Sequence, residues 1–503
     1  MNTIDSIDPS TGAVVESVSD VTTHAQVSEL AAKAKSAASM FAACGRPFRA
    51  RLLRAIADEL DEIRPDVVTI GMRETALHEA RLNAELTRTV YQARLFADVV
   101  DDGAYLEATI DHATNTPMGP GPDLRRMLVP IGPVAVFGAS NFPLAFSVPG
   151  GDTISALAAG CPVVIKAHSS HPALSLLTFE AMTRAARSMG APDGLLGILF
   201  GTSAGARLVA DPAVTAVGFT GSLDSGKALM GIIASRKDPI PFYGELSSLN
   251  PVIVTPGAAA SRGSEIASGL VASVTGSGGQ LCTKPGLVLV PNGADGDSLV
   301  AEAARLMEQS PAATLLTARI STAYERIIAS LKTAKGAAML AEGGKPSSDG
   351  FSVTPRLVQV DQSALQYHEV DECFGPATVI ARYSVADLAG AIAVLPASLT
   401  GTIHAEDDEI ELVSEVSSAL QSKAGRLLFN SYPTGVLVSW GQHHGGPWPS
   451  TNNQHTSVGA TSIRRWLRPM AWQSAPSEVL PAELHDGYTS VVRRVDGRIV
   501  CPH

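Results

Sequence analysis

Hydrophobic positions recur at two different spacings along the chain, and each spacing predicts its own kind of element. In the N-terminal part they recur at helical spacing. We expect helices over residues 24–44, 47–63 and 73–100, with Pro65 ending the second of them. Residues 1–25 are expected to form short strands and turns ahead of these helices. We assign no chemistry to this part of the chain and expect it to serve in packing.

From residue 130 onward, short apolar runs alternate with helical stretches. The runs that predict buried strands are 134–137, 163–165, 195–200 and 216–220. A helix is expected to begin at an Asp152 cap and to end at Gly160. Strands that alternate with helices form parallel sheets, which bind ligands at the carboxyl ends of their strands. Asn141, Lys166 and the turn at 221–222 follow such strands, so we expect a nucleotide-type site there.

A second set of strands follows residue 246. Its predicted members are 252–254, 287–290, 377–380, 401–404 and 426–429. The sequence therefore predicts an α/β protein with two such units. Residues 104–128 are rich in Pro, Gly and Thr and are expected to be irregular, either a linker or an arm that crosses to a partner subunit. The tail, residues 461–503, receives no functional assignment.

Composition narrows the class of protein. The chain has 503 residues, 45% of them hydrophobic, which is enough for two or three domains with sizeable cores. A net charge of −11 argues against a general nucleic-acid surface. Five scattered cysteines without CxxC spacing fit a reducing compartment better than a disulfide framework. The polar N-terminus lacks a signal-peptide pattern and no apolar run could span a bilayer, so we expect a cytoplasmic protein without membrane contacts.

Candidate chemistry centres on Cys282, which follows the glycine-rich stretch 276–279 and precedes a predicted strand. Glycines let the backbone approach a ligand closely, and a thiol placed there is available as a nucleophile. The alternative is an inert core cysteine. Lys166, at the end of an apolar strand, must reach solvent or an anion, and a phosphate or ribose is one such partner. Glu245, which lies between two turns, is either a reactive acid or a solvated one.

Two other patterns offer competing interpretations. Residues 201–205 read G-x-S-x-G after a strand and before a helix, which is the context of a serine-hydrolase nucleophile, here Ser203. The alternative is a tight turn of small residues. His443 and His444, and His368 among acidic residues, raise the question of a metal site. Their spacing matches no zinc-protease motif, so we expect solvated histidines and no metal.

Several segments, in order along the chain, resemble motifs of the aldehyde dehydrogenase superfamily. They are 138–143 (GASNFP), 164–166 (VIK), 218–222 (GFTGS), 244–246 (GEL) with 250–251 (NP), 279–282 (GQLC), 372–376 (ECFGP), 430–435 (NSYPTG) and 444–447 (HGGP). The resemblance implies a fold of two Rossmann-like parallel-sheet domains and a small oligomerisation arm. It also implies a homodimer or homotetramer that acts on a small-molecule aldehyde.

The resemblance further implies domain limits and residue roles. The coenzyme-binding domain would comprise residues 1–103 and 130–245, the catalytic domain 246–445, and the arm with the tail 104–129 and 446–503. Cys282 would be the nucleophile, Glu245 the general base and Asn141 the oxyanion donor, with Lys166 also in the catalytic set. The implied coenzyme contacts are Lys166, Ser169, Gly221, Ser222, Glu372 and Phe374. The implied aldehyde contacts are Phe142 and Phe429.

Within the superfamily, residues 166–172 and 79–83 are most similar to α-ketoglutaric semialdehyde (2,5-dioxopentanoate) dehydrogenases, with NADP-dependent fatty aldehyde dehydrogenases as a related branch. We therefore expect oxidation of α-ketoglutaric semialdehyde to 2-oxoglutarate, with a long-chain fatty aldehyde or another semialdehyde as the alternative. Ser169 stands where many NAD-preferring members carry an acid. A serine leaves room for the 2′-phosphate, which favours NADP while leaving NAD open.

Overall fold

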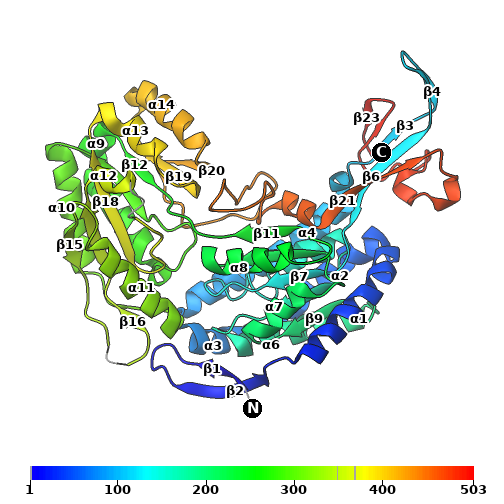
Figure 1. The fold of residues 1–503 in the computed structure, drawn as a ribbon, viewed down its shortest axis with the longest axis horizontal. Coiled ribbons are helices and arrows are strands. Elements are labelled where there is room, and N and C mark those ends of the chain that lie inside the picture. The colour runs from blue at the N-terminus through cyan, green and yellow to red at the C-terminus, as the bar shows by residue number, and fades with distance from the viewer. Residues whose placement is uncertain (1–2, 348, 367–369, 503) are drawn as a thin grey trace.

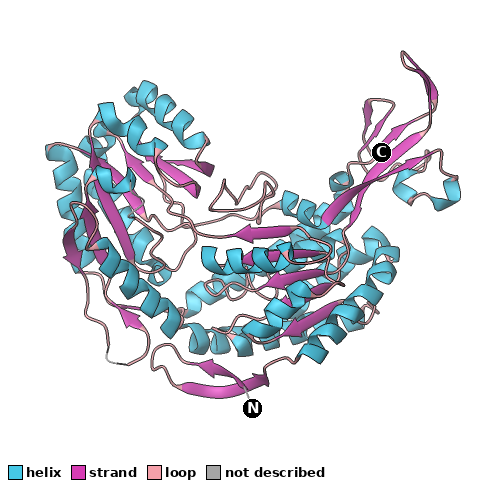
Figure 2. Ribbon diagram, viewed as in Figure 1, coloured by secondary structure: helices cyan, strands magenta, loops and turns pink. Residues whose placement is uncertain are grey.

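The computed structural model describes residues 3–347, 349–366 and 370–502. Two α/β lobes lie next to each other, and a strand-rich arm projects from one of them (Figure 1). Each lobe is built on a sheet of mostly parallel strands, with helices packed over it (Figure 2). The structure thus confirms the predicted α/β class with two parallel-sheet units and an arm.

The N-terminal region is helical, as predicted, but contains one more helix than expected. It comprises β1 (Thr3–Ile7), β2 (Val14–Asp20), α1 (His24–Ala43), α2 (Gly45–Glu62), α3 (Arg64–Thr75) and α4 (Glu79–Asp102). Pro65 follows the end of α2 but lies in the first turn of α3, where its missing N–H costs no helical hydrogen bond. The expected helix over residues 73–100 therefore begins later, at Glu79.

The first lobe holds a five-stranded parallel sheet in the order β11-β10-β7-β8-β9. Its strands are β7 (Val134–Phe137), β8 (Val163–Lys166), β9 (Leu196–Leu199), β10 (Ala216–Thr220) and β11 (Phe242–Glu245), and its helices are α5 (Gly151–Ala159), α6 (Pro172–Ser188), α7 (Thr202–Ala210) and α8 (Leu223–Ala234). Gly160 ends α5 in the left-handed conformation, as predicted. The expected Asp152 cap is wrong, because Gly150 holds that position and Asp152 pairs with Arg465 at 3.0 Å.

The second lobe holds a seven-stranded sheet in the order β15-β17-β18-β13-β12-β19-β20. Its strands are β12 (Val252–Val254), β13 (Leu287–Pro291), β15 (Ala338–Glu342), β17 (Arg356–Val360), β18 (Ala377–Tyr383), β19 (Ser398–His404) and β20 (Ala424–Phe429). Only β15 runs antiparallel to its neighbour. The pattern analysis missed β15 and β17, and a separate short pair comprises β14 (Ala313–Thr314) and β16 (Ser352–Val353).

The remaining elements of the second lobe are helices. They are α9 (Pro256–Thr275), α10 (Ala294–Glu308), α11 (Ala318–Leu331), α12 (Gln362–Gln366), α13 (Leu388–Ala393) and α14 (Ile410–Gln421). Short 3₁₀ helices occur along the whole chain: η1 (Ala104–Leu106), η2 (Gly276–Gly279), η3 (Val385–Asp387), η4 (Asp407–Glu409), η5 (Ala460–Trp466), η6 (Ser477–Val479) and η7 (Ala482–Leu484).

The arm is a sheet that joins the middle of the chain to its end. Its strands are β3 (Thr109–Asp111), β6 (Leu124–Pro130), β21 (Leu467–Gln473), β22 (Arg493–Val495) and β23 (Arg498–Val500), in the order β21-β6-β3-β22-β23. Between β3 and β6 lies a hairpin of β4 (Thr114–Thr116) and β5 (Gly119–Gly121). The expectation that residues 104–128 are irregular is therefore wrong, and the tail completes their sheet.

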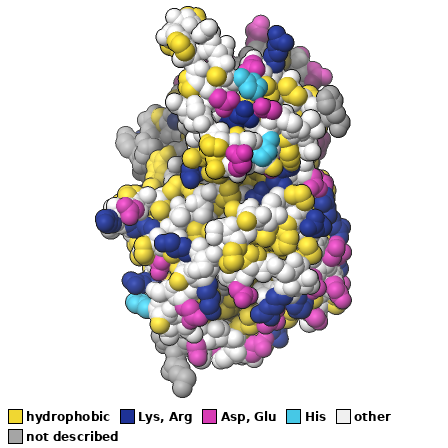
Figure 3. All heavy atoms as spheres, turned by 90° about the vertical axis from the view of Figure 1, so that its right-hand side faces the viewer, with side chains coloured by type: hydrophobic (Ala, Val, Ile, Leu, Met, Phe, Trp, Pro, Cys, Tyr) yellow, Lys and Arg dark blue, Asp and Glu magenta, His cyan; other side chains and the backbone are white. Residues whose placement is uncertain are grey.

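Polar contacts hold the tail on the arm. The ring of His112 lies between Asp486 and Asp496, at 3.2 and 2.9 Å, and Arg125 pairs with Asp486 at 2.7 Å. The face of the molecule in Figure 3 mixes charged, polar and apolar side chains. Within the described ranges, the helices are either too short or too polar to cross a bilayer.

Candidate active site

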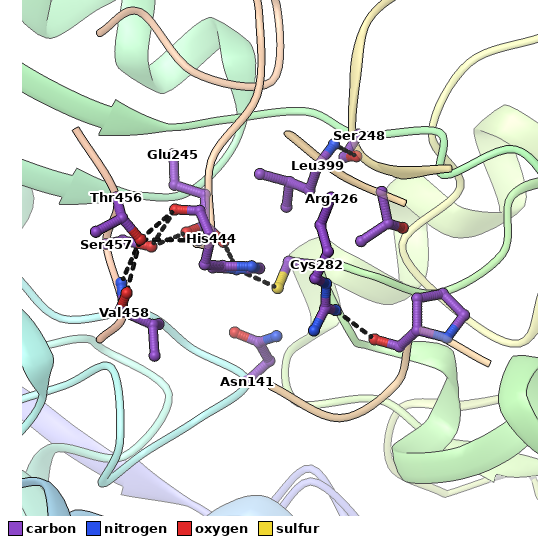
Figure 4. Close-up of polar contacts among 12 residues, drawn as sticks. Asn141, Glu245, Ser248, Cys282, Leu399, Arg426, His444, Thr456, Ser457 and Val458 are labelled. Carbon is purple, nitrogen blue, oxygen red and sulfur yellow. Dashed lines mark hydrogen bonds and ion pairs between the residues drawn. The ribbon is translucent and has the colours of Figure 1, made fainter. Parts of the chain in front are cut away.

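Cys282, Glu245 and His444 meet between the two lobes (Figure 4). Cys282 lies in the loop between η2 and β13, Glu245 is the last residue of β11, and His444 comes from the long loop after β20. Nε2 of His444 is 3.5 Å from Sγ of Cys282 and 3.1 Å from Oε1 of Glu245. The Ser457 hydroxyl donates to Oε2 of Glu245 at 2.9 Å, so hydrogen bonds hold both carboxylate oxygens in this buried site.

The loop that carries Cys282 is fixed by a close approach of two backbones. Gly279 has a φ of +67°, and a Cβ built there would lie 2.2 Å from the Gly375 carbonyl oxygen. No other residue fits at this position. On the other side of Cys282, the Asn250 side chain donates from Nδ2 to the carbonyls of Cys282 and Lys284, at 2.8 and 3.0 Å. The thiol is therefore presented from a loop that is pinned at both ends.

Asn141 reaches the same site from the loop after β7. Its Nδ2 donates to the Gln280 carbonyl oxygen at 2.8 Å, two residues before the thiol. The Asn141 loop is held by the buried carboxylate of Glu85, whose Oε1 accepts from the backbone N–H groups of Leu144 and Ala145 at 2.9 and 2.8 Å. A primary amide has two N–H donors, so the second hydrogen of Asn141 is available for a ligand.

The surroundings of the site lower the pKa of the Glu245 carboxyl and raise the pKa of the Cys282 thiol. Burial, followed by the negative charge of Glu245, raises the pKa of Cys282 well above its ordinary value. Burial alone would also raise the pKa of Glu245. However, attraction to His444 and hydrogen bonds from His444, Ser457 and Cys282 lower this pKa below its usual range. Glu245 is therefore a carboxylate at neutral pH, whereas Cys282 holds its proton until a base removes it.

The predicted coenzyme contacts Lys166, Gly221 and Ser222 lie at the carboxyl edge of the first sheet. Lys166 ends β8, where burial lowers its pKa to about 8, and in the described part of the chain its ammonium has no hydrogen-bond partner. Gly221 has no space for a side chain, because a Cβ there would lie 2.6 Å from the Phe219 ring. Ser222 caps α8. A free cation and a close-lying backbone at a helix N-terminus fit a dinucleotide.

The other predicted coenzyme contacts surround this edge. Ser169 is exposed in the turn that follows β8. Glu372 lies in the second lobe, where Oε2 accepts from the Ser248 N–H at 3.3 Å, and burial raises its pKa to about 7. Phe374 is half-buried and directly precedes Gly375, whose carbonyl abuts the Cys282 loop. The ECFGP segment and the thiol loop therefore lie in contact.

The two predicted aldehyde contacts differ in their surroundings. Phe142 packs edge-to-face on Phe146, with ring centroids 5.2 Å apart, beneath the Arg81 guanidinium at 4.5 Å. Phe429, at the end of β20, is 51% exposed, and in the described ranges it makes no ring contact with the other predicted site residues. Phe142 is thus joined to the site, whereas the role of Phe429 stays a prediction.

The histidine prediction is wrong for His444, which is buried and bonded rather than solvated. His443 is half-buried, and His368 lies outside the described residues. The donor atoms of Glu245, Cys282 and His444 lie within 4.8 Å of one another, which is close enough to share a metal ion. The expectation of no metal stays a prediction. A histidine ahead of two glycines in a recognised motif was the signal that pointed to His444.

Ser203, the alternative nucleophile, is exposed in the first turn of α7. Within the described ranges, no hydrogen bond joins it to a histidine or to an acid, so it lacks the base that a serine nucleophile requires. The structure gives this alternative no support.

Comparison with known proteins places the chain among close relatives. A family model described as the aldehyde dehydrogenase family matches residues 1–469. The α-ketoglutaric semialdehyde dehydrogenase 2 of Azospirillum brasilense is 42% identical over 506 residues, covering 99% of this chain and 96% of its own. The α-ketoglutaric semialdehyde dehydrogenase of Acinetobacter baylyi is 40% identical over 460 residues, covering 89% and 86%.

Solved structures show the same fold. Aldehyde dehydrogenase C of Pseudomonas syringae, in complex with NAD+ and octanal, superposes with a TM-score of 0.80 at 20% identity and covers 94% of each chain. The match of fold, family model and near-full-length relatives agrees with the thiol, carboxylate and amide found in one site. This chain belongs to the aldehyde dehydrogenase family, whose members oxidise aldehydes with NAD or NADP.

Proposed function

We propose that the protein oxidises α-ketoglutaric semialdehyde to 2-oxoglutarate through a covalent intermediate on Cys282. The observation that supports the chemistry is the meeting of the Cys282 thiol with the Glu245 carboxylate and the Asn141 amide in one buried site. The choice of aldehyde rests on two relatives of that name, at 42% and 40% identity.

The first step is deprotonation of the thiol, since the thiolate is the nucleophile. The proton of Cys282 passes to water, and Glu245 stays ionised. The Nε2–H of His444, until then donated to Oε1, turns to the sulfur 3.5 Å away and stabilises the thiolate. One hydrogen bond therefore moves from the carboxylate to the thiolate as the thiol loses its proton.

The thiolate then attacks the aldehyde carbon, and the carbonyl oxygen becomes an oxyanion. The free hydrogen of the Asn141 amide and the backbone N–H of Cys282 donate to it. Each donor of this kind is worth roughly 10²–10³ in rate. A bound nicotinamide ring would supply the hydride acceptor, and loss of hydride from the substrate carbon would leave a thioester on Cys282.

Residues of both lobes would hold the coenzyme. Lys166 and Glu372 would hold its ribose hydroxyls, and the backbone at 221–222 would receive its pyrophosphate. Phe374 would pack near the nicotinamide. Ser169 brings no negative charge to the turn after β8, which supports NADP as the preferred coenzyme, with NAD also accepted.

Hydrolysis completes the cycle. The ionised Glu245 takes a proton from a water molecule that attacks the thioester carbon. The acid is released and the thiol is restored. A general base of this kind contributes about 10²–10⁴ in rate.

We further propose the domain limits and assembly given by the sequence. The first sheet lies within residues 130–245 and the second within 246–445, and the arm draws on 104–129 and on the tail. A sheet with two open edges offers a surface for assembly into a dimer or tetramer. Action in the cytoplasm on a small aldehyde agrees with free, undisulfided cysteines.

The test is absorbance of the reduced coenzyme with purified protein. The substrates are 2,5-dioxopentanoate and a long-chain aldehyde such as decanal, each with NADP and with NAD. We expect the dioxo acid to give a kcat/KM at least about tenfold above that of decanal. Preference for decanal would assign the enzyme to fatty aldehydes. No reduction with any aldehyde would contradict the proposed function as a whole.

A further inference from the structure

Arg88 enters the site from α4 with most of its hydrogen-bonding capacity unused. Its Nε donates to the Val436 carbonyl oxygen at 3.3 Å, whereas Nη1 and Nη2 are shielded from solvent and have no partner in the described part of the chain. A guanidinium carries five N–H donors, and burying unpaired donors on a cation is costly. A group left in this state inside a functional site points to a ligand that completes it.

Arg88 differs from the other arginines of this helix in having no carboxylate partner among the described residues. Arg81 pairs with Oε2 of Glu85 at 2.6 Å, and Arg94 pairs with Asp58 at 2.9 Å. The other oxygen of Glu85 is already occupied by two backbone N–H groups. No carboxylate of the described chain therefore pairs with Arg88.

Packing places Arg88 close to the reacting atoms. Its guanidinium carbon lies 5.0 Å from the centroid of the Phe146 ring, and that ring is 6.2 Å from the ring of His444. His444 in turn contacts the Cys282 sulfur. Burial lowers the pKa of Arg88, whereas Glu85 and, to a lesser extent, Cys282 act in the opposite direction, which agrees with a short separation from both.

A second arginine borders the same segment of chain. Arg426 of β20 donates through Nη2 and Nη1 to the carbonyls of Pro433 and Gly435, at 3.4 and 3.3 Å, and its buried Nε has no partner among the described residues. Figure 4 shows Arg426 beside Cys282. Since Arg88 contacts Val436, the two cations flank the segment 433–436.

We propose that Arg88, assisted by Arg426, binds the terminal carboxylate of the aldehyde substrate and so selects an anionic semialdehyde. The inference rests on the proposed function, because it names the group that recognises its substrate. In a five-carbon 2-oxo semialdehyde, the carboxylate carbon lies about 5 Å from the aldehyde carbon when bond lengths are about 1.5 Å. The flat guanidinium fork matches the two carboxylate oxygens.

The test compares an anionic aldehyde with an uncharged one of the same length. We would measure kcat/KM for 2,5-dioxopentanoate and for 4-oxopentanal in the wild type and in Arg88→Met, Arg88→Lys and Arg94→Met. In Arg88→Met the ratio of the two values should fall at least about 100-fold. Arg88→Lys should lose less, because it keeps the charge without the fork. Arg94→Met is the matched control and should keep the wild-type ratio.

A binding measurement removes turnover from the test. In a Cys282→Ala background, 2-oxoglutarate should bind in titration calorimetry, and Arg88→Met should weaken this binding at least about tenfold while Arg94→Met does not. If Arg88→Met does not fold, Arg88→Lys and Arg88→Gln carry the same comparison. An unchanged ratio and unchanged binding would overturn the assignment of Arg88. Such a result leaves the proposed function standing, which fails if the wild type does not oxidise 2,5-dioxopentanoate.

Discussion

The sulfur of Cys282 lies 3.5 Å from Nε2 of His444, across 162 residues of sequence. His444 is also hydrogen-bonded to Glu245. One histidine therefore contacts both the nucleophile and the general base that acts later in the reaction. The reactivity of the Cys282 thiol should therefore change when either His444 or Glu245 is replaced.

Thiol alkylation should respond in opposite directions to the two neighbours. His444→Phe removes the donor to the thiolate, so the rate of alkylation of Cys282 by iodoacetamide at pH 8 should fall about tenfold. Glu245→Gln removes the negative charge that raises the pKa of Cys282, so the rate should rise about tenfold. Mass spectrometry of the modified peptide separates Cys282 from the exposed Cys501.

His443→Phe is the control for this experiment, since His443 adjoins His444 without bonding to the thiol. Equal rates in the wild type and His444→Phe would show that the histidine does not stabilise the thiolate.

Loss of the Glu245 carboxylate should separate the two halves of the reaction. Glu245→Gln should give a burst of about one reduced coenzyme per chain, followed by turnover at least about 100-fold slower. Stopped-flow absorbance measures the burst, and hydroxylamine should release the trapped thioester. Glu478→Gln, a change on the exposed tail, should behave as the wild type. Absence of the burst would place Glu245 before hydride transfer.

A charge at residue 169 should decide between the two coenzymes. Ser169→Asp brings a carboxylate to the exposed turn after β8 and repels a 2′-phosphate. We expect kcat/KM with NADP to fall about 100-fold, while the value with NAD changes less than about threefold. Steady-state kinetics with both coenzymes measures the ratio. Ser235→Asp, beyond the end of α8, is the control, and an unchanged ratio in Ser169→Asp would remove this turn from coenzyme selection.

The buried carboxyl of Glu372 should make the stability of the protein depend on pH. Its folded-state pKa is raised to about 7, above the ordinary 4.5. The folded state therefore keeps a proton that the unfolded state has lost, so this group lowers stability as pH rises from about 4.5 to 7. Glu372→Gln is neutral throughout and should raise Tm by about 2 °C relative to the wild type at pH 8, but not at pH 4.

Differential scanning calorimetry at both pH values measures this effect. Glu308→Gln, an exposed change on α10, provides the baseline. A difference in Tm that is the same at both pH values would show that folding does not raise the pKa of Glu372.

The local pattern of apolar residues was sufficient to predict strands that are buried within one sheet. Strands β7 and β10 have the predicted bounds, because every inward position is apolar and a turn follows. Strand β15 was missed because it lies at the edge of the second sheet, where polar residues are tolerated. Strand β17, the next strand, was missed because Arg356 and Gln359 interrupt its apolar run. Pro65 was misjudged because proline both ends one helix and begins the next.

The site also contains residues that could be predicted from the sequence and residues that could not. Cys282, Glu245 and Asn141 stand in motifs, and the structure brings them together as the resemblance implied. His444 stands in a motif too, but its role, like that of Arg88, could not be assigned from sequence, because it depends on burial and on partners far away in the chain. No local spacing records a contact between residues so far apart in the chain.

The sheet of the arm joins strands that are far apart in the sequence, so it can form only late during synthesis. The backbone N–H of His112 donates to Asp496 at 2.9 Å, across 384 residues, and β22 lies beside β3. At about 5–20 residues per second, a ribosome makes β3 well before it makes β22. The lobes have their strands by residue 429, whereas the arm must wait for β22 and β23. The arm is therefore finished only after the strands of both lobes have been made, and a chain without β22 would leave one edge of β3 unpaired.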